Sequence, residues 1–341
     1  MFIHSRSIAL KVFNLIALAL LACSCASLPV TDPEPATQAR NPALVEPALP
    51  EPVPAAEPVV VAAPRHTAII VSADIPVFMS IAEAISELPE AGAYSIHNLD
   101  GNILNTLPVL QDVREAGAEQ VVAIGLPAAV AARQFDNMPV VFCQTYNYQD
   151  HDLLAPNSKG VSMLPPFEEQ FTAWRQLSPE LLRVGVIARP NQEDRLARIT
   201  AAGAAVGVQV ISREVSSDKE TLLEFKRLVP EIQGLLLLPD NRILSPQILR
   251  EIMSYAGKHS TQIGVYGSQM LGLGGVVSFS SVDSDVAQAA LSRLNDVTAS
   301  GELNGPPIAQ LSEIVTQINF EVAAKLGLSV PMQVAEAGAK D

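Results

Sequence analysis

From residue 66 onward, short apolar runs alternate with segments of helical periodicity, and this alternation restricts the fold more than any other feature. Residues 67–72 (TAIIVS) are apolar and β-branched, as in a buried strand, and residues 77–88 then carry apolar side chains at helical spacing. The pattern continues with expected strands at 94–99, 119–125 and 139–143 and expected helices at 103–116 and 127–134. Such alternation predicts a parallel sheet with helices on both faces.

The same alternation then begins again. We expect helices at 167–177, from a cap at Asn191 to 207, at 219–228 and after the Ser245-Pro246 cap, with strands at 183–188, 208–212, 234–238 and 263–266. Two successive sets of four strands predict two similar lobes. The fold class is therefore α/β, with two doubly wound parallel-sheet lobes.

The last part of the chain is expected to join the two lobes. Strands at 276–279 and 313–318 and helices at 286–297 and 320–326 would cross between the lobes, complete both sheets and form a multi-stranded hinge. The amino-terminal lobe would comprise residues 65–163 plus about 276–300, and the carboxyl-terminal lobe residues 164–275 plus about 301–331. Residues 332–341 would be a tail.

The first 22 residues have the pattern of an export signal. Arg6 and Lys11 are followed by an apolar run that is too short to span a bilayer comfortably, and small residues end it. The sequence Leu-Leu-Ala-Cys ending at Cys23 resembles a bacterial lipobox, in which the cysteine is acylated, for example with palmitate. An ordinary secretory signal with an incidental cysteine is the alternative. Acylation would anchor the chain to a membrane without spanning it.

A proline-rich segment follows, and we interpret residues 23–64 as a tether. Residues 29–64 contain ten prolines, a composition typical of an extended, semi-rigid spacer. Without residues 1–22 the chain has 20 basic and 36 acidic residues, a net charge of about −16. Nucleic acid is therefore not an expected partner. Cys25 and Cys143 are expected to be free thiols, because a domain of this size does not need disulfides.

Common catalytic signatures are missing from the sequence. HExxH, GxSxG and GxxxxGK[ST] do not occur, and the histidines after the signal, His66, His97, His151 and His259, lack metal-ligand spacing. The glycine-rich residues 272–275 precede a strand and fit a tight turn better than a dinucleotide fingerprint. We therefore expect a protein that is not an enzyme and that has no cofactor and no metal site.

The candidate ligand-binding residues follow the expected strands, because doubly wound sheets bind ligands beyond the carboxyl ends of their strands. The turn at Gly125 leads into a helix N-terminus and would suit a carboxylate, while Asp240 could receive an ammonium group. Tyr146, Tyr148 and Tyr266 could stack on a cyclic ligand. The full candidate set is Ser72, Asp74, Asn98, Gly125, Leu126, Pro127, Ala128, Gln144, Thr145, Tyr146, Asn191, Asp240, Asn241 and Tyr266.

Several of these residues have a second interpretation. Asp74, Asn191 and Asp240 are residue types that cap helices. Tyr148 is equally consistent with an exposed loop, and the turn at Gly125 could serve packing alone. These alternatives stay open at the level of sequence.

Three segments resemble the substrate-binding family of ABC transporters that includes tryptophan- and tyrosine-binding lipoproteins. They are VVAIGLPAAVAARQFDNMPVVF at 121–142, LSPELLRVGVIARPNQ at 177–192 and NFEVAAKLGLSVP at 319–331. The resemblance covers about residues 66–331. It implies a type I periplasmic-binding fold whose two lobes close on a small solute.

The chain also departs from the family pattern. Gln144-Thr145-Tyr146 stands where family members tend to have Asp-Pro, and residues 158–161 (SKGV) replace an Asn-x-Thr-Gly pattern. Ser24 after the lipobox cysteine is not the aspartate-type signal for inner-membrane retention, so outer-membrane sorting is consistent with it.

Two functions follow from the sequence. The first is a lipid-anchored solute-binding protein on the periplasmic side of a bacterial membrane. It would deliver a small amino-acid-like or aromatic solute to an ABC permease, with a lipid anchor as its one membrane contact. The alternative is an outer-membrane-tethered interaction module that reuses the fold without transport and binds another envelope protein.

Overall fold

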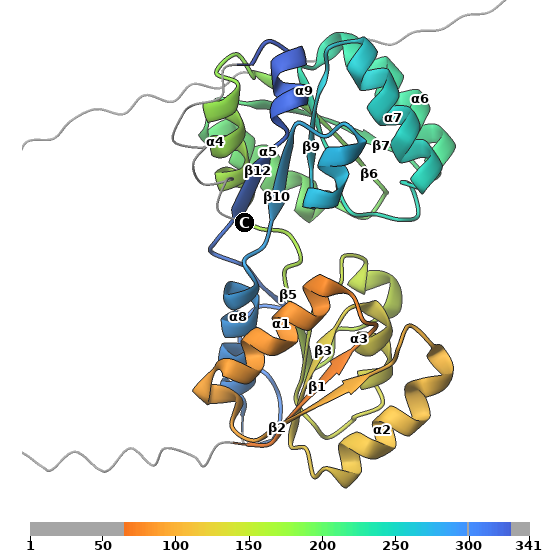
Figure 1. Ribbon diagram of the computed structural model, residues 1–341. Helices are drawn as coiled ribbons and strands as arrows, with labels where there is room; N and C mark the ends of the chain where they lie inside the picture. The colour runs from red at the N-terminus through yellow and green to blue at the C-terminus, as the bar shows by residue number, and fades with distance from the viewer. Residues whose placement is uncertain (1–64, 299, 329–341) are drawn as a thin grey trace, which may run out of the picture. The chain divides into compact units, whose positions relative to one another are not determined.

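The computed structural model describes residues 65–298 and 300–328, which form two six-stranded sheets, each covered by helices (Figure 1). The expected signal peptide, the acylated Cys23, the tether and the tail at 332–341 lie outside the described residues. Within the described residues, no helix is long and apolar enough to span a membrane.

The first sheet has the strand order β11-β5-β4-β3-β1-β2, and all its pairs are parallel. Its strands are β1 (Thr67–Val71), β2 (Tyr94–Asn98), β3 (Gln120–Ile124), β4 (Val140–Cys143), β5 (Ser158–Val161) and β11 (Ile308–Ala309). Strands β1, β3 and β4 are buried throughout, as expected for a sheet with two covered faces. Helices α1 (Pro76–Glu87) and α8 (Asp283–Asn295) cover one face, and α2 (Thr106–Glu115) and α3 (Leu126–Ala132) cover the other.

The second sheet has the order β12-β10-β9-β8-β6-β7 and is parallel except for the antiparallel pair of β10 and β12. Its strands are β6 (Arg183–Ala188), β7 (Gln209–Glu214), β8 (Gly234–Leu236), β9 (Gln262–Val265), β10 (Val277–Ser280) and β12 (Val315–Ile318). Helices α4 (Phe167–Leu177), α5 (Glu193–Ala205) and α9 (Phe320–Lys325) pack on one face, and α6 (Asp218–Leu228) and α7 (Pro246–Lys258) pack on the other.

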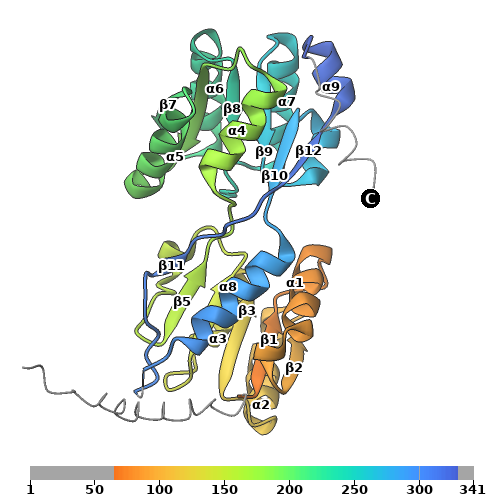
Figure 2. The same ribbon diagram turned by 90° about the vertical axis from the view of Figure 1, so that its left-hand side faces the viewer.

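Three segments cross between the two sheets, as Figure 2 shows. They connect β5 to α4, β10 to α8, and β11 to β12. The Ser162 amide donates to the Ala309 carbonyl at 2.8 Å, so two of the crossings begin side by side. The expected lobe ranges differ from the structure in detail. Residues 277–280 pair in the second sheet and residues 308–309 in the first, while α8 between them packs on the first sheet.

Other differences concern short elements. The sequence analysis missed β5 and β11, because SKGV and a two-residue strand have too little apolar pattern to detect. The helix expected at 103–116 is a 3₁₀ turn, η2 (Ile103–Asn105), followed by α2. Pro108 lies in the first turn of α2, where its missing N–H is tolerated, so it does not interrupt the helix.

Trp174 is the largest fully buried side chain of the second lobe. It is 0% exposed, and its indole N–H donates to Gln262 Oε1 at 2.8 Å. Two glycines on neighbouring strands make room for the ring. A Cβ atom on either Gly234 or Gly264 would lie 2.7 Å from an indole carbon. The indole therefore packs directly on the backbone of β8 and β9.

Helix α6 begins with a reciprocal cap that resembles a capping box. Ser217 Oγ accepts a hydrogen bond from the Glu220 amide at 3.3 Å, and Glu220 Oε2 accepts one from the Ser216 amide at 2.7 Å. We expect Ser217→Ala to lower the free energy of unfolding by about 1 kcal/mol. This corresponds to about 2–4 °C in Tm for a domain of this size, measured by circular dichroism. Ser216→Ala is the matched control, because Ser216 contributes its backbone amide alone. An equal loss in both variants would contradict the cap.

Candidate functional site

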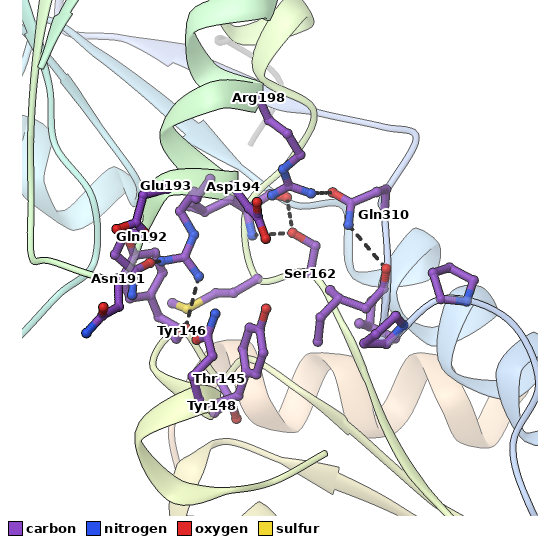
Figure 3. A pocket seen from close by; sticks show the side chains of 18 residues that line it. Thr145, Tyr146, Tyr148, Ser162, Asn191, Gln192, Glu193, Asp194, Arg198 and Gln310 are labelled. Carbon is purple, nitrogen blue, oxygen red and sulfur yellow. Dashed lines mark hydrogen bonds between the residues drawn. The ribbon is translucent and has the colours of Figure 1, made fainter. Parts of the chain in front are cut away.

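A cleft of about 400 Å³ lies where the ends of β4 and β5 approach the start of α5 (Figure 3). It also receives residues 306–310, which lead into and past β11. The cleft is lined by Thr145, Tyr146, Tyr148, Gln149, Val161, Ser162, Met163, Leu164, Asn191, Gln192, Glu193, Asp194, Arg195, Arg198, Pro306, Pro307, Ile308 and Gln310. Residues of both lobes therefore share one cavity of the size that small-molecule sites have.

The structure brings part of the candidate set into this cleft. Thr145, Tyr146 and Asn191 line it, and so does Tyr148. The candidates outside its lining are Ser72, Asp74, Asn98, Gly125, Leu126, Pro127, Ala128, Gln144, Asp240, Asn241 and Tyr266. The candidates chosen because they follow the ends of strands therefore include part of the lining of this cavity.

The turn at Gly125 is occupied by the protein's own hydrogen bonds. Ser72 Oγ donates to the Ile124 carbonyl at 2.8 Å and accepts from the Ala128 amide at 3.0 Å. Gly125 has φ +87°, and a Cβ there would lie 2.6 Å from Ser72 Oγ. Since Pro127 has no N–H, a carboxylate at this turn would find little more than the Leu126 amide. The observed contacts agree with the packing interpretation of this glycine.

Asp240 is also engaged. It is 2% exposed, and its Oδ2 accepts a hydrogen bond from Arg189 Nε at 2.7 Å. Its Oδ1 accepts from Asn147 Nδ2 and from the Arg242 amide, both at 3.1 Å. The guanidinium group of Arg189 therefore already neutralises the Asp240 carboxylate. From the sequence, we expected an ammonium group of the ligand to bind at this carboxylate.

The other candidates are hydrogen-bonded within the protein, partly buried or exposed. The Asn98 side chain accepts from the Asp100 amide at 2.8 Å, and Gln144 Nε2 donates to Ser281 Oγ at 3.4 Å. Asp74 and Asn241 are exposed, and Tyr266 is partly buried between two apolar clusters. Burial raises the pKa of the Tyr266 phenol.

Asn191 does not cap α5, although the sequence placed a cap there. The N-cap position is Gln192, and its side chain makes no capping bond. Asn191 instead has φ +62° and is exposed at the rim of the cleft. This left-handed conformation is one that asparagine tolerates, and it turns the chain from β6 into α5.

Tyr146 and Arg195 form a stacked pair at the centre of the site. The Arg195 guanidinium carbon lies 4.0 Å from the centroid of the Tyr146 ring. Arg195 also donates to the Tyr146 carbonyl at 3.3 Å and to the Gln192 side chain. Burial raises the pKa of Tyr146 to about 12, and nearby Asp240 adds to the rise while Arg195 opposes it. The ring is therefore a neutral phenol at physiological pH.

Arg198 lies one turn after Arg195 and also lines the cleft. It donates to Gln310 Oε1 at 2.5 Å, and this bond connects α5 to the segment that follows β11. Burial lowers the Arg198 pKa, and the positive charge of Arg195 lowers it further. Within residues 65–298 and 300–328, neither arginine forms an ion pair with a carboxylate.

Sequence reasoning missed both arginines. They lie three residues apart in α5, which begins beyond the end of β6, so they share one helix face. That spacing is visible in the sequence and could have indicated an anion-binding edge. Arg195 lies four residues beyond Asn191, the candidate that follows the end of β6.

Cys143 is a free, buried thiol, as expected, and burial raises its pKa to about 12, with a further rise from Asp283. Cys25 lies outside the described residues. In the part of the chain that the structure describes, no group of three histidine, cysteine, aspartate or glutamate residues could hold a metal ion.

No family model matches the chain, and no curated protein sequence matches it. Solved structures do. An ABC domain in complex with L-Trp from Streptococcus pneumonia is 17% identical with a TM-score of 0.55, over 81% of this chain and 98% of that one. A ligand-free, open substrate-binding protein with adhesive properties from Clostridium difficile is 14% identical, with a TM-score of 0.57, over 79% of this chain and 96% of that one. The chain has the type I periplasmic-binding fold.

A conserved domain protein from Vibrio cholerae has the same fold, with 14% identity and a TM-score of 0.53 over 81% of this chain and 99% of that one. These likenesses confirm the α/β class with two parallel-dominated sheets and the fold that the sequence resemblance implied. At this level of identity, these likenesses show the fold alone. In this fold, the residues that follow β4 and β6 line a common cleft.

Proposed function

We propose that the chain is a solute-binding protein that captures a small carboxylate-bearing solute between its two lobes and catalyses no reaction. The observation that carries this proposal is the pair of arginines, Arg195 and Arg198, which line a cleft of about 400 Å³ without a carboxylate partner among the described residues. Two guanidinium groups on one helix face repel each other, and a bound anion relieves that repulsion.

The walls of the cleft favour a solute with a flat apolar part. Tyr146 and Tyr148 contribute rings, and Met163, Leu164 and Ile308 contribute aliphatic surface. Because stacking on Arg195 holds the Tyr146 ring, this wall is formed before the solute arrives, which reduces the entropy cost of binding. Glu193 and Asp194 at the same edge offer carboxylates to an ammonium group. An amino-acid-like or aromatic acid fits these features.

The cellular part of the proposal depends on the amino-terminal sequence. An acylated Cys23 and a proline-rich tether would hold the lobes on the periplasmic side of a membrane, where an ABC permease could receive the solute. Crosslinking in living cells tests this part. Recovery of permease subunits would support import, whereas recovery of a cell-wall enzyme alone would contradict it in favour of a tethered interaction module.

Solute binding is expected to stabilise the protein. A solute at 100 times its Kd should raise the free energy of unfolding by about 2.7 kcal/mol. The measurement is a thermal-shift screen of the full chain in detergent, followed by calorimetry, against amino acids and aromatic acids. L-tryptophan and its carboxamide form the matched pair, because the amide lacks the negative charge. The proposal fails if no acid in a broad library shifts Tm, or if acid and amide bind equally.

A further inference from the structure

A polar network joins the two lobes beside the cleft without lining it. Asn147 and Asp150 come from the loop after β4 in the first lobe, and Arg189 and Asp240 follow β6 and β8 in the second. None of these four residues lines the cavity.

Arg189 is the centre of this network. Its Nε donates to Asp240 Oδ2 at 2.7 Å within the second lobe. Its Nη2 reaches across to Asp150 Oδ2 at 2.6 Å and to Asn147 Oδ1 at 3.1 Å. One planar guanidinium group thus holds acceptors of both lobes, in the fork geometry that lysine cannot reproduce.

The inner part of the network is buried, whereas Asp150 lies at its exposed edge. Asn147 and Asp240 are 8% and 2% exposed, and the two are themselves bonded at 3.1 Å. Arg242 adds its backbone amide to Asp240 and its side chain to Asp150, at 3.1 and 3.3 Å. The Arg189–Asp240 pair is therefore largely shielded from solvent, and salt screens such a pair less than it screens exposed charges.

The network also controls the wall of the cleft. Asn147 stands in the loop between Tyr146 and Tyr148, both of which line the cavity. Fixing Asn147 to Arg189 and Asp240 therefore sets where the two rings lie relative to α5 in the second lobe.

We propose that Arg189 and its partners Asn147, Asp150 and Asp240 form a pin that holds the lobes in contact in the absence of solute. The pin positions the Tyr146–Tyr148 wall and keeps the cleft assembled. Its consequence for solute affinity rests on the function proposed above. If the assembled state is the one that binds, the apparent Kd rises in proportion as that state becomes less populated.

The test uses a double variant that cuts only the bonds between lobes. Asn147→Ala with Asp150→Ala leaves the Arg189–Asp240 pair inside the second lobe intact, so that lobe is expected to fold. Glu231→Gln is the matched control, because it removes an Arg213 ion pair that lies wholly within the second lobe.

The readout is a distance between spin labels on the two lobes, measured without solute. Gln111→Cys on α2 and Lys219→Cys on α6 are exposed sites for labelling. The full chain would carry Cys23→Ser and Cys25→Ser, and buried Cys143, with its raised pKa, should not react. The double variant is expected to broaden the distance distribution and shift it, while Glu231→Gln leaves it unchanged. An unchanged distribution in the double variant would overturn the pin.

Calorimetry with L-tryptophan as the probe gives a second readout. We expect the double variant to bind about tenfold more weakly than the unmodified chain, for a tenfold fall in the assembled fraction. If the unmodified chain does not bind L-tryptophan, that result counts against this solute, and the label distances alone decide on the pin. If the distances shift and the affinity does not, the assembled state is not the binding state and that consequence is wrong.

Discussion

Replacing Arg195 by methionine is expected to weaken binding of a carboxylate solute by about 30- to 150-fold, equivalent to about 2–3 kcal/mol. The variant removes a guanidinium group that lines the cleft and has no carboxylate partner among the described residues. Methionine keeps an apolar stem against Tyr146, so the wall loses charge more than it loses packing. Calorimetry with L-tryptophan measures the change.

Two controls separate charge from packing in this experiment. Arg213→Met removes an arginine of the second lobe whose ion pairs with Glu224 and Glu231 lie away from the cleft. The affinity of this variant for L-tryptophan should match that of the unmodified chain. The carboxamide of tryptophan should bind weakly to both proteins, with a similar Kd for the Arg195→Met variant and for the unmodified chain. Equal losses for acid and amide would mean that Arg195 supports the wall and does not receive the carboxylate.

Replacing Trp174 by alanine is expected to lower the free energy of unfolding by about 3–5 kcal/mol. The indole is fully buried on the backbone of Gly234 and Gly264, so truncation leaves a cavity beside two glycines that have no side chain to fill it. The loss of the N–H also removes a partner of Gln262 Oε1, which stays buried.

Thermal and denaturant unfolding of the full-length variant would measure this loss. We expect the Tm of the transition that unfolds the second lobe to fall by about 10 °C. Phe320→Ala is the control, because that ring is 46% exposed at the start of α9 and its truncation should cost far less. A Trp174→Ala variant that unfolds within 0.5 kcal/mol of the unmodified chain, on the order expected for surface substitutions, would contradict the packing argument.

The amount of the fold that could be predicted followed the strength of the local pattern. Strands such as TAIIV and QVVAI are buried on both faces, and a strand of that kind is apolar at most positions, which the sequence displays directly. The polar exceptions, Thr67 and Gln120, are hydrogen-bonded to each other. Strands β5 and β11 could not be found in the same way. SKGV and the two-residue β11 carry little apolar pattern, and β11 pairs with β5 across more than 140 residues of chain.

The candidate site was predictable to a smaller degree. Strand ends indicated Thr145, Tyr146 and Asn191, which do line the cleft. The same rule also chose Asp240 and the turn at Gly125, whose hydrogen-bonding groups are used within the protein. A sequence shows which residues follow a strand, but it does not show which of them are already bonded to a neighbour from a distant segment.

The sequence by itself determined the two-lobed α/β class, because apolar periodicity is a local property that each strand and helix carries with it. Only the tertiary structure decided which polar groups are free. It neutralised Asp240 with Arg189, left Arg195 and Arg198 without a carboxylate partner among the described residues, and joined the lobes through Asn147. The physical reason is that charge pairing depends on separations of a few ångströms between residues far apart in the chain, which periodicity does not encode.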